Sequence, residues 1–423
     1  MNAIRASLVI VTGLFGACPS LAQDAPPPDP NAVQSTQLPD AAPNAGGPVE
    51  RSDKVVVSDL NVVDGDPVGT LDDTSGSLGS DMWMNVPRGE LERLVEATPI
   101  ASRIRVVRDL SRRLMLTPSE SPAGTGKRAL VAIRIQKFLE GGFISDADQL
   151  ALKVHLPKNP DVARMQANAI LLAGDTARAC GDVTAHRLSD GDAFWLQLRA
   201  YCFAVAHTQA QADLIDQLLD AQGETDKAYL ILRNDVLKHQ STAPGAIPNA
   251  TPMHVFLFKA AKLKIPPAIA AQFHLASAPV LANPDTDIAP EEEFPATTDA
   301  PTSSQRYALH SGLAQALGAS ISYDENQDVA GAATTHWIGA RPPESEMQKI
   351  ADAAVQPARR GEAILRILEA VDQRGLEGMA PDISIRFVQT LKQIGLDAEA
   401  KQLAVQALHD YREPVSPAPA PTP

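Results

Sequence analysis

The chain has 423 residues, of which 44% are hydrophobic, ample for a folded core. Its net charge of −14 and the lack of an evident basic patch argue against nucleic acid or anionic lipid headgroups as partners. Only 4% of the residues are aromatic, while alanine and leucine are abundant. This composition favours the packing of helix on helix over sheets.

Residues 1–22 have the organisation of an export signal. A positive charge in MNAIR precedes the apolar run ASLVIVTGLFGA, and Ser20 and Ala22 place small residues at the −3 and −1 positions of a cleavage site. We therefore expect cleavage between Ala22 and Gln23 and a soluble periplasmic protein. No later segment is continuously apolar over the roughly 20 residues that a spanning helix requires, so no transmembrane span is expected.

The same stretch has a second possible cleavage site, before Cys18, which would leave a lipid-anchored protein. A lipidation motif prefers a leucine-like residue three positions before the cysteine, where this chain has Phe15, and Pro19 follows directly. Cleavage after Ala22 also leaves an even pair of cysteines. The sequence therefore favours soluble export over a lipid anchor at Cys18.

Two segments have the composition of disordered chain. Residues 23–80 and 413–423 are rich in proline and small or polar residues and have few large apolar side chains. Such segments cannot bury enough surface to offset the entropy lost on ordering. We expect both to be disordered, with order beginning near Trp83.

Between Trp83 and residue 410, apolar residues recur at i, i+3 and i+4, and breaks fall at Gly, Pro or Asp. This pattern predicts successive amphipathic helices and no run of strands. The expected helices span residues 87–97, 100–116, 127–139, 146–154, 160–172, 176–187, 192–206, 209–222, 224–239, 253–263, 267–276, 305–318, 344–355, 359–374, 383–394 and 398–410. They form an N-terminal helical-repeat block (81–240), a helix pair with a loose polar connection (241–302) and a C-terminal block (303–412).

A spacing recurs in which a turn residue precedes an alanine by five positions. The pairs are Gly142 with Ala147, Gly174 with Ala179, His207 with Ala212, and Gly395 with Ala400. The first three alanines lie 32 and 33 residues apart, and Ala407 follows Ala400 by seven. A left-handed glycine turn followed by alanines suits a hairpin of two closely packed helices.

These features resemble the tetratricopeptide repeat. The best match is FVQTLKQIGLDAEAKQLAVQAL, with Gly395, Ala400 and Ala407 at the turn and small-residue positions, and LLAGDTARA is a second match. His207 departs from the turn glycine, and the first-helix Trp, Leu-Gly and Tyr of the family are mostly absent. The resemblance implies an all-α, irregular solenoid of stacked antiparallel hairpins with disordered ends. An irregular helical bundle is the alternative fold.

The chain also resembles a poorly characterised group of exported alphaproteobacterial proteins, sometimes labelled antifreeze glycopeptide polyprotein. The segments that carry this resemblance are LLAGDTARAC, WLQLRAYCFAVA and TPMHVFLFKAAKLKIP. The label has little value here, because Ala/Pro-rich tails attract it by composition and the sequence lacks a flat, Thr-rich ice-binding repeat.

Cys180 and Cys202 are the two cysteines outside the signal, eleven residues on either side of Gly191. In an antiparallel hairpin that turns near Gly191, the two positions lie at the same height along the helices. An exported protein also meets an oxidising compartment. We expect a Cys180–Cys202 disulfide, with two buried reduced thiols as the alternative.

The sequence contains no motif that carries chemistry. HExxH and GxSxG are absent, and AGTGKRAL lacks the first glycine of a phosphate loop and the Ser/Thr after Lys127. Acidic pairs such as Asp146/Asp148 and Glu90/Glu92 are interpreted as ordinary charges at helix starts. No catalytic residue, cofactor or metal ligand is therefore expected.

These observations favour a non-enzymatic periplasmic scaffold or adaptor that mediates protein–protein interaction in the cell envelope. Its partner would be an unidentified envelope protein or peptide. The alternative is an accessory module or enzyme of peptidoglycan or envelope metabolism, which predicts a cleft with convergent carboxylates. A purely structural role is the third hypothesis, and the sequence does not indicate an oligomeric state.

Overall fold

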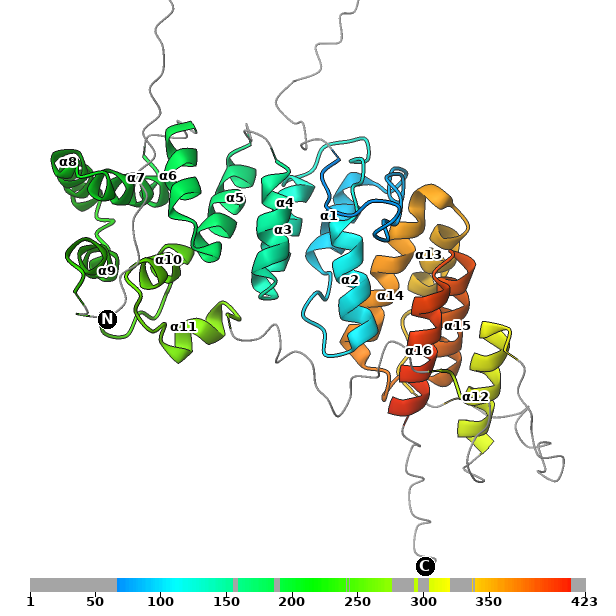
Figure 1. Cartoon of the computed structure of the whole chain (residues 1–423). Helices are drawn as coiled ribbons and strands as arrows, with labels where there is room; N and C mark the ends of the chain where they lie inside the picture. Colours follow the sequence, from blue (N-terminus) through cyan, green and yellow to red (C-terminus); the bar gives the residue numbers. More distant parts are fainter. Residues whose placement is uncertain are drawn as a thin grey trace, which may run out of the picture. The chain divides into compact units, whose positions relative to one another are not determined.

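The structure is a computed structural model, drawn in Figure 1. It describes residues 67–154, 159–185, 191–240, 242, 244–275, 293–295, 304–319, 337 and 339–411. The expected signal peptide with its cleavage site at Ala22 and Gln23, Cys18, and the expected disordered residues 23–66 and 413–423 lie outside these ranges. None of the helices described is long and apolar enough to cross a membrane.

The fold is all-α, as the sequence predicts. The α-helices are α1 (Arg88–Glu96), α2 (Arg105–Leu116), α3 (Leu130–Glu140), α4 (Ile144–Leu152), α5 (Pro160–Ala173), α6 (Thr176–Ala185), α7 (Ala193–Val205), α8 (Gln209–Ala221), α9 (Lys227–Lys238), α10 (Pro252–Ala260), α11 (Pro267–Gln272), α12 (Ser304–Leu317), α13 (Glu344–Ala354), α14 (Arg360–Arg374), α15 (Pro381–Gln393) and α16 (Asp397–Asp410). Extended pairing within the described ranges is limited to one bridge, between Ala340 and Met379.

Successive helices from α3 to α8 pack against their neighbours in chain order, as a solenoid of hairpins requires. The hairpins α3/α4, α5/α6 and α7/α8 each close through a short turn, and α13/α14 and α15/α16 do the same in the C-terminal block. The hairpin order breaks after α8. Helix α10 packs on α5 and α9 instead of adding a layer beyond α8.

The return of α10 is fixed by an aromatic contact and a lysine–carbonyl hydrogen bond. The rings of Tyr201 in α7 and Phe256 in α10 meet edge to face with centroids 5.0 Å apart. Lys259 at the end of α10 donates to the carbonyl of Leu172 in α5. Burial lowers the pKa of this amine below its ordinary value.

The two helical blocks are joined directly in space, although the sequence suggests only a loose connection between them. Helix α14 packs on α1 and α2, and α16 also packs on α2. One hydrophobic core runs through both blocks and includes Leu94 of α1 and Leu368 of α14, each at most 2% exposed. Helix α1 therefore lies between α3 and α14, and is not an open end of the packing order.

The structure corrects the N-terminal boundary of order. Residues 67–80 were expected to be disordered, yet Val68 and Leu78 are buried, and the backbone N–H of Thr70 donates to the carbonyl of Leu116 at 2.9 Å. The reason is Arg134, whose buried guanidinium donates to the carbonyl of Val68 at 2.8 Å. The segment has few apolar side chains, but the buried Arg134 guanidinium needs hydrogen-bond acceptors, and the Val68 carbonyl of the segment supplies one.

Candidate functional site

The predicted disulfide is confirmed. Cys180 in α6 and Cys202 in α7 are bonded, with their Cα atoms 5.4 Å apart. The two cysteines are 22 residues apart in sequence, and a cross-link that closes a loop of this length contributes about 3 kcal/mol to the free energy of unfolding. It ties two helices that are neighbours in the solenoid, so its role is structural.

The turn positions share one backbone geometry. Gly142, Gly174 and Gly395 have φ of 78°, 87° and 85°, and His207 adopts φ of 61° at the equivalent place. In each turn the N–H of this residue donates to the carbonyl three residues back. The next N–H donates to the carbonyl five residues before it, as Phe143 does to Phe138. These residues close hairpins.

The alanines of the repeat all lie at helix contacts. Ala147, Ala179, Ala212, Ala400 and Ala407 are each at most 2% exposed. A methyl side chain at these positions lets the paired helices approach closely. They are packing residues.

Arginine–aspartate pairs connect each hairpin of the first block to the next. Along the second helices, Arg112 of α2 pairs with Asp146 of α4, and Asp148 of α4 pairs with Arg178 of α6, with N–O distances of 2.8 and 2.9 Å. Asp146 lies in the first turn of α4, as the sequence indicates, and both Asp146 and Asp148 in addition pair with arginines of neighbouring helices.

The first helices of the hairpins carry a second row of such pairs. Arg128, just before α3, bonds Asp161 of α5 at 2.9 Å. Arg164 of α5 bonds Asp192, which caps α7, at 3.0 Å, and its guanidinium lies 3.9 Å from the centroid of the Phe194 ring. Both rows fix the relative positions of successive hairpins.

The AGTGK loop binds a carboxylate of the chain itself. The backbone N–H groups of Lys127 and Arg128 donate to Glu92 at 2.8 and 3.0 Å. A Cβ on Gly126 would lie 2.7 Å from the Glu92 carboxylate, so glycine is required for this approach. The loop has the amide groups of an anion site, but Glu92 of α1 already occupies them.

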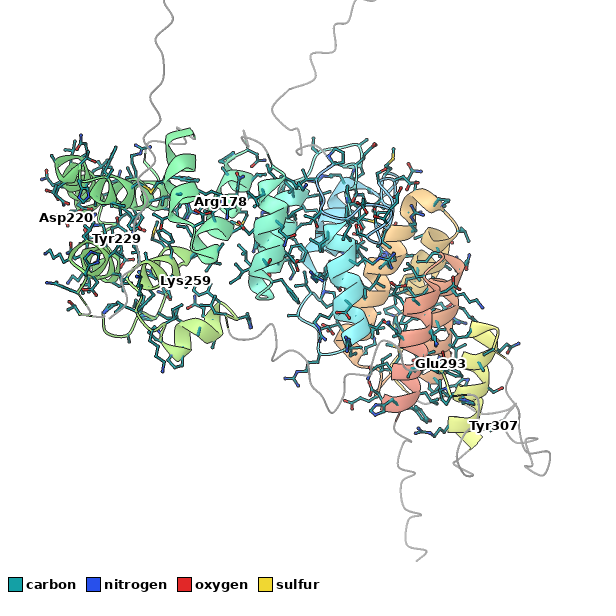
Figure 2. The ribbon with its side chains drawn as sticks, viewed as in Figure 1. Arg178, Asp220, Tyr229, Lys259, Glu293 and Tyr307 are labelled. Atoms are coloured by element: carbon teal, nitrogen blue, oxygen red, sulfur yellow. A yellow bond between two sulfur atoms is a disulfide. The ribbon has the colours of Figure 1, made fainter. Side chains whose placement is uncertain are left out.

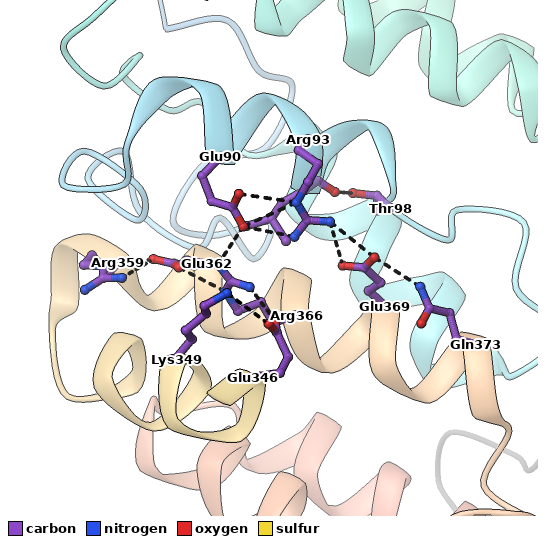
Figure 3. Close-up of polar contacts among 11 residues, drawn as sticks. Glu90, Arg93, Thr98, Glu346, Lys349, Arg359, Glu362, Arg366, Glu369 and Gln373 are labelled. Atoms are coloured by element: carbon purple, nitrogen blue, oxygen red, sulfur yellow. Dashed lines mark hydrogen bonds and ion pairs between the residues drawn. The ribbon is translucent and has the colours of Figure 1, made fainter. Parts of the chain in front are cut away.

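An ion network joins α1 to the C-terminal block (Figure 3). The Arg366 guanidinium, 2% exposed, contacts Glu362 at 2.9 Å and Glu90 at 2.7 Å, and it also bonds Glu346. Burial acts to lower the pKa of Arg366, but the hydrogen bonds that its guanidinium donates to Glu346 and Glu362 outweigh this effect and raise the pKa above its ordinary value. Arg366 is therefore a permanent cation shared by three helices.

Three further ion pairs reinforce the same junction. They are Arg93 with Glu369 at 3.3 Å, Arg360 with Asp81 at 2.7 Å, and Arg113 with Glu399. Because each joins a residue before position 120 to one after position 350, sequence spacing gives no signal for them.

A cleft of about 650 Å³ opens at this junction. Its walls are the loop between α1 and α2, the end of α3, the end of α14 with the segment that follows it, and the last turn of α16. Apolar wall residues are Pro99, Ile104 and Leu376. The charged wall residues are Arg103, Lys137, Glu140, Asp372, Glu377 and Asp410. We take this junction cleft as the candidate functional site.

A second cleft of about 630 Å³ lies among α5, α7, α9 and the loop before α10. It contains a hydroxyl, an imidazole and a carboxylate in series. The Thr251 Oγ1 lies 3.0 Å from His254 Nδ1, and His254 Nε2 lies 3.0 Å from Asp226. The backbone N–H of Thr251 also donates to Nδ1, so the proton sits on Nε2 and faces Asp226.

This series is explained by helix capping. Thr251 and His254 form the capping box of α10, and Asp226 accepts from the backbone N–H of Tyr229 as the cap of α9. The series therefore fixes two helix starts against each other. Among the residues that the structure describes, no group of three His, Cys, Asp or Glu side chains could hold a metal ion.

Comparison of the chain with protein-family models, with curated proteins and with solved structures gives no match.

Proposed function

We propose that this protein is a non-enzymatic helical-repeat scaffold of the periplasm, built of tetratricopeptide-like hairpins, that binds a segment of a partner protein in the junction cleft. The observation that supports the proposal is the lining of the cleft. Apolar residues such as Ile104 and Leu376 lie among charged ones of both signs, the mixture expected for a peptide of mixed character.

The rigidity of the cleft walls supports the same function. One wall is the loop between α1 and α2. The ion network around Arg366 ties α1 to the wall helix α14, and the pair of Arg113 with Glu399 ties α2 to the wall helix α16. A preformed cleft costs less ordering entropy on binding than a mobile one. The disulfide supports the periplasmic location, because such bonds persist in oxidising compartments.

Site-specific photocrosslinking tests the proposal. A photoreactive amino acid replaces Arg103, an exposed residue of the cleft wall, in the protein expressed in its native host. The control carries it at Gln217, an exposed residue of α8 outside the cleft. We expect one defined adduct from position 103 and not from position 217. Equal adducts from both positions, or none from position 103, would contradict the proposal.

One observation favours the alternative in peptidoglycan metabolism. Four carboxylates, those of Glu140, Asp372, Glu377 and Asp410, line the junction cleft, as this alternative expects. Paired carboxylates are the groups that cleave glycosidic bonds. Turnover of purified murein by the wild type that is lost in Asp372→Asn and kept in Asp352→Asn would establish it, since Asp352 lies outside the cleft on α13.

A further inference from the structure

A short acidic and aromatic segment, Glu293–Pro295, contacts the last helices of the chain. The Phe294 ring stacks on the imidazole of His310 in α12, with centroids 5.1 Å apart and planes inclined by only 8°. His310 Nε2 lies 2.8 Å from the Pro295 carbonyl oxygen. Because a carbonyl only accepts, Nε2 carries the proton and donates it.

A charge contact orients the segment further. Lys401 of α16 lies 3.3 Å from the Glu293 carboxylate (Figure 2 labels Glu293 beside α16). Both groups are exposed, so this ion pair orients the segment more than it strengthens the binding of the segment. Three successive residues of the segment thus have three different partners: an ammonium for the acid, an imidazole face for the ring and an N–H donor for the proline carbonyl.

The surface that receives the segment is held by contacts of its own. Helix α12 is fixed to α15, where a Cβ on Gly312 would lie only 2.3 Å from Ile385, and Lys392 donates to the carbonyl of Leu317. Leu309 and Leu313 of α12 are buried as well. The surface that His310 of α12 and Lys401 of α16 present to the segment therefore does not depend on the segment for its position.

We propose that this surface of α12 and α16 is a binding site for linear peptides of the form acid–aromatic–proline, and that Glu293–Phe294–Pro295 occupies it in cis as an internal competitor. Each of the three contacts is made by one residue of the segment, so a peptide in trans can make all of them. The proposal goes beyond the proposed function, because no residue of the junction cleft takes part in it.

Proline is part of the recognised chemistry for two reasons. It favours an extended conformation of the preceding residue. It also has no N–H of its own that would need a partner on the α12 and α16 surface. Phe294 and Pro295 can therefore present a ring and a carbonyl to the same imidazole.

The test uses a fluorescent synthetic peptide, EEEFPAT, the sequence of residues 291–297, titrated with the full chain and followed by anisotropy. A covalently attached competitor acts at a high effective concentration, so the wild type should bind the peptide weakly. Removing the internal ring in Phe294→Ala should raise the affinity about tenfold or more. The matched control Phe273→Ala, a half-buried phenylalanine in another part of the chain, should bind as the wild type does.

Two further measurements decide the chemistry. In the Phe294→Ala background, Lys401→Glu should weaken binding of EEEFPAT and restore it for a peptide with lysines in place of the glutamates. A peptide with alanine in place of its phenylalanine should not bind any variant. Equal affinity of the wild type and a folded Phe294→Ala, or undiminished binding of the alanine peptide, would overturn the proposal. Loss of folding in Phe294→Ala, seen as loss of the helical circular dichroism signal at 25 °C, would also overturn it, since the surface of α12 and α16 would then depend on its occupant.

Discussion

The guanidinium of Arg366 lies 2.7 Å from the carboxylate of Glu90, although 276 residues separate them in the chain. The Glu362 carboxylate of α14, which is 2% exposed, also forms an ion pair with the Arg366 guanidinium. This arrangement joins α1, the first helix that the structure describes, to α14 in the C-terminal block. Its strength can be measured by substitution.

Replacing Arg366 with alanine should destabilise the protein strongly. The substitution removes one of the two cations, Arg359 and Arg366, that pair with the buried Glu362, and removing one partner of a buried pair costs about 3 to 5 kcal/mol in the free energy of unfolding. Urea unfolding followed by circular dichroism measures the loss. Lys349→Ala is the control, since Lys349 is 54% exposed and its pair with Glu346 should contribute less than about 1 kcal/mol. Similar losses for both variants would refute a buried role of Arg366.

The same junction should weaken in acid. Burial raises the pKa of Glu90, but hydrogen bonds and attraction to Arg93 and Arg366 outweigh it and hold this pKa below its ordinary value of 4.5. A carboxyl with a lower pKa in the folded state stabilises that state above its ordinary pKa. The contribution is lost as the pH falls below 4.5 and through the folded-state pKa.

Glu90→Gln should therefore lose stability at neutral pH and show a flatter decline of the urea midpoint below pH 4.5 than the wild type. Glu344→Gln serves as the control, because Glu344 is 87% exposed and should leave the pH profile unchanged. A Glu90→Gln profile parallel to that of the wild type would show that Glu90 does not titrate with folding.

The disulfide should be present in protein taken from the cell. Mass spectrometry after alkylation should find Cys180 and Cys202 joined, and Cys180→Ser with Cys202→Ser should lower the free energy of unfolding by about 3 kcal/mol. The bond joins α6 to α7, which also pack against each other without it, so the double variant should remain helical. Two free thiols in freshly isolated protein would disprove the pairing.

The turn residues give a pair of substitutions with opposite signs. Gly395 has φ of 85° and no atom near the place of a Cβ, so Gly395→Ala should cost about 1 kcal/mol through backbone strain alone. His207 has φ of 61° at the equivalent turn, and His207→Gly should stabilise by about 0.5 kcal/mol after the entropy cost of glycine. Thermal unfolding of both variants measures the two shifts. The same sign for both would show that the turns are not equivalent.

The presence and approximate position of each helix could be predicted from the sequence, because apolar periodicity is a local signal. Each expected helix has a counterpart, with bounds that differ by a few residues, as for the helix expected at 100–116 that begins at Arg105. Glycine turns such as Gly174 could be predicted for the same reason. The left-handed turns at Lys262 and His274 could not, since nothing in these side chains favours positive φ.

The candidate site could not be predicted. Its walls meet only because α14 packs on α1 and α2, and an isolated sequence does not show which of many arginines will reach which carboxylate. Glu90 and Asp146 illustrate this point, because both have the ordinary spacing of helix-start acids and both hold an arginine of another helix. The order of residues 67–80 was missed because it depends on Arg134, more than fifty positions later.

The packing of α14 on α1 also sets when the protein can finish folding. Synthesis proceeds from the N-terminus, so α1 and α2 emerge some 260 residues before the helix that covers them. During that interval Leu94 and its apolar neighbours in α1 cannot yet pack against α14. The α3–α8 hairpins can form before α1 and α2 complete their packing. A chain truncated before α14 should therefore expose an aggregation-prone apolar face on α1 and α2 and need a chaperone to stay in solution.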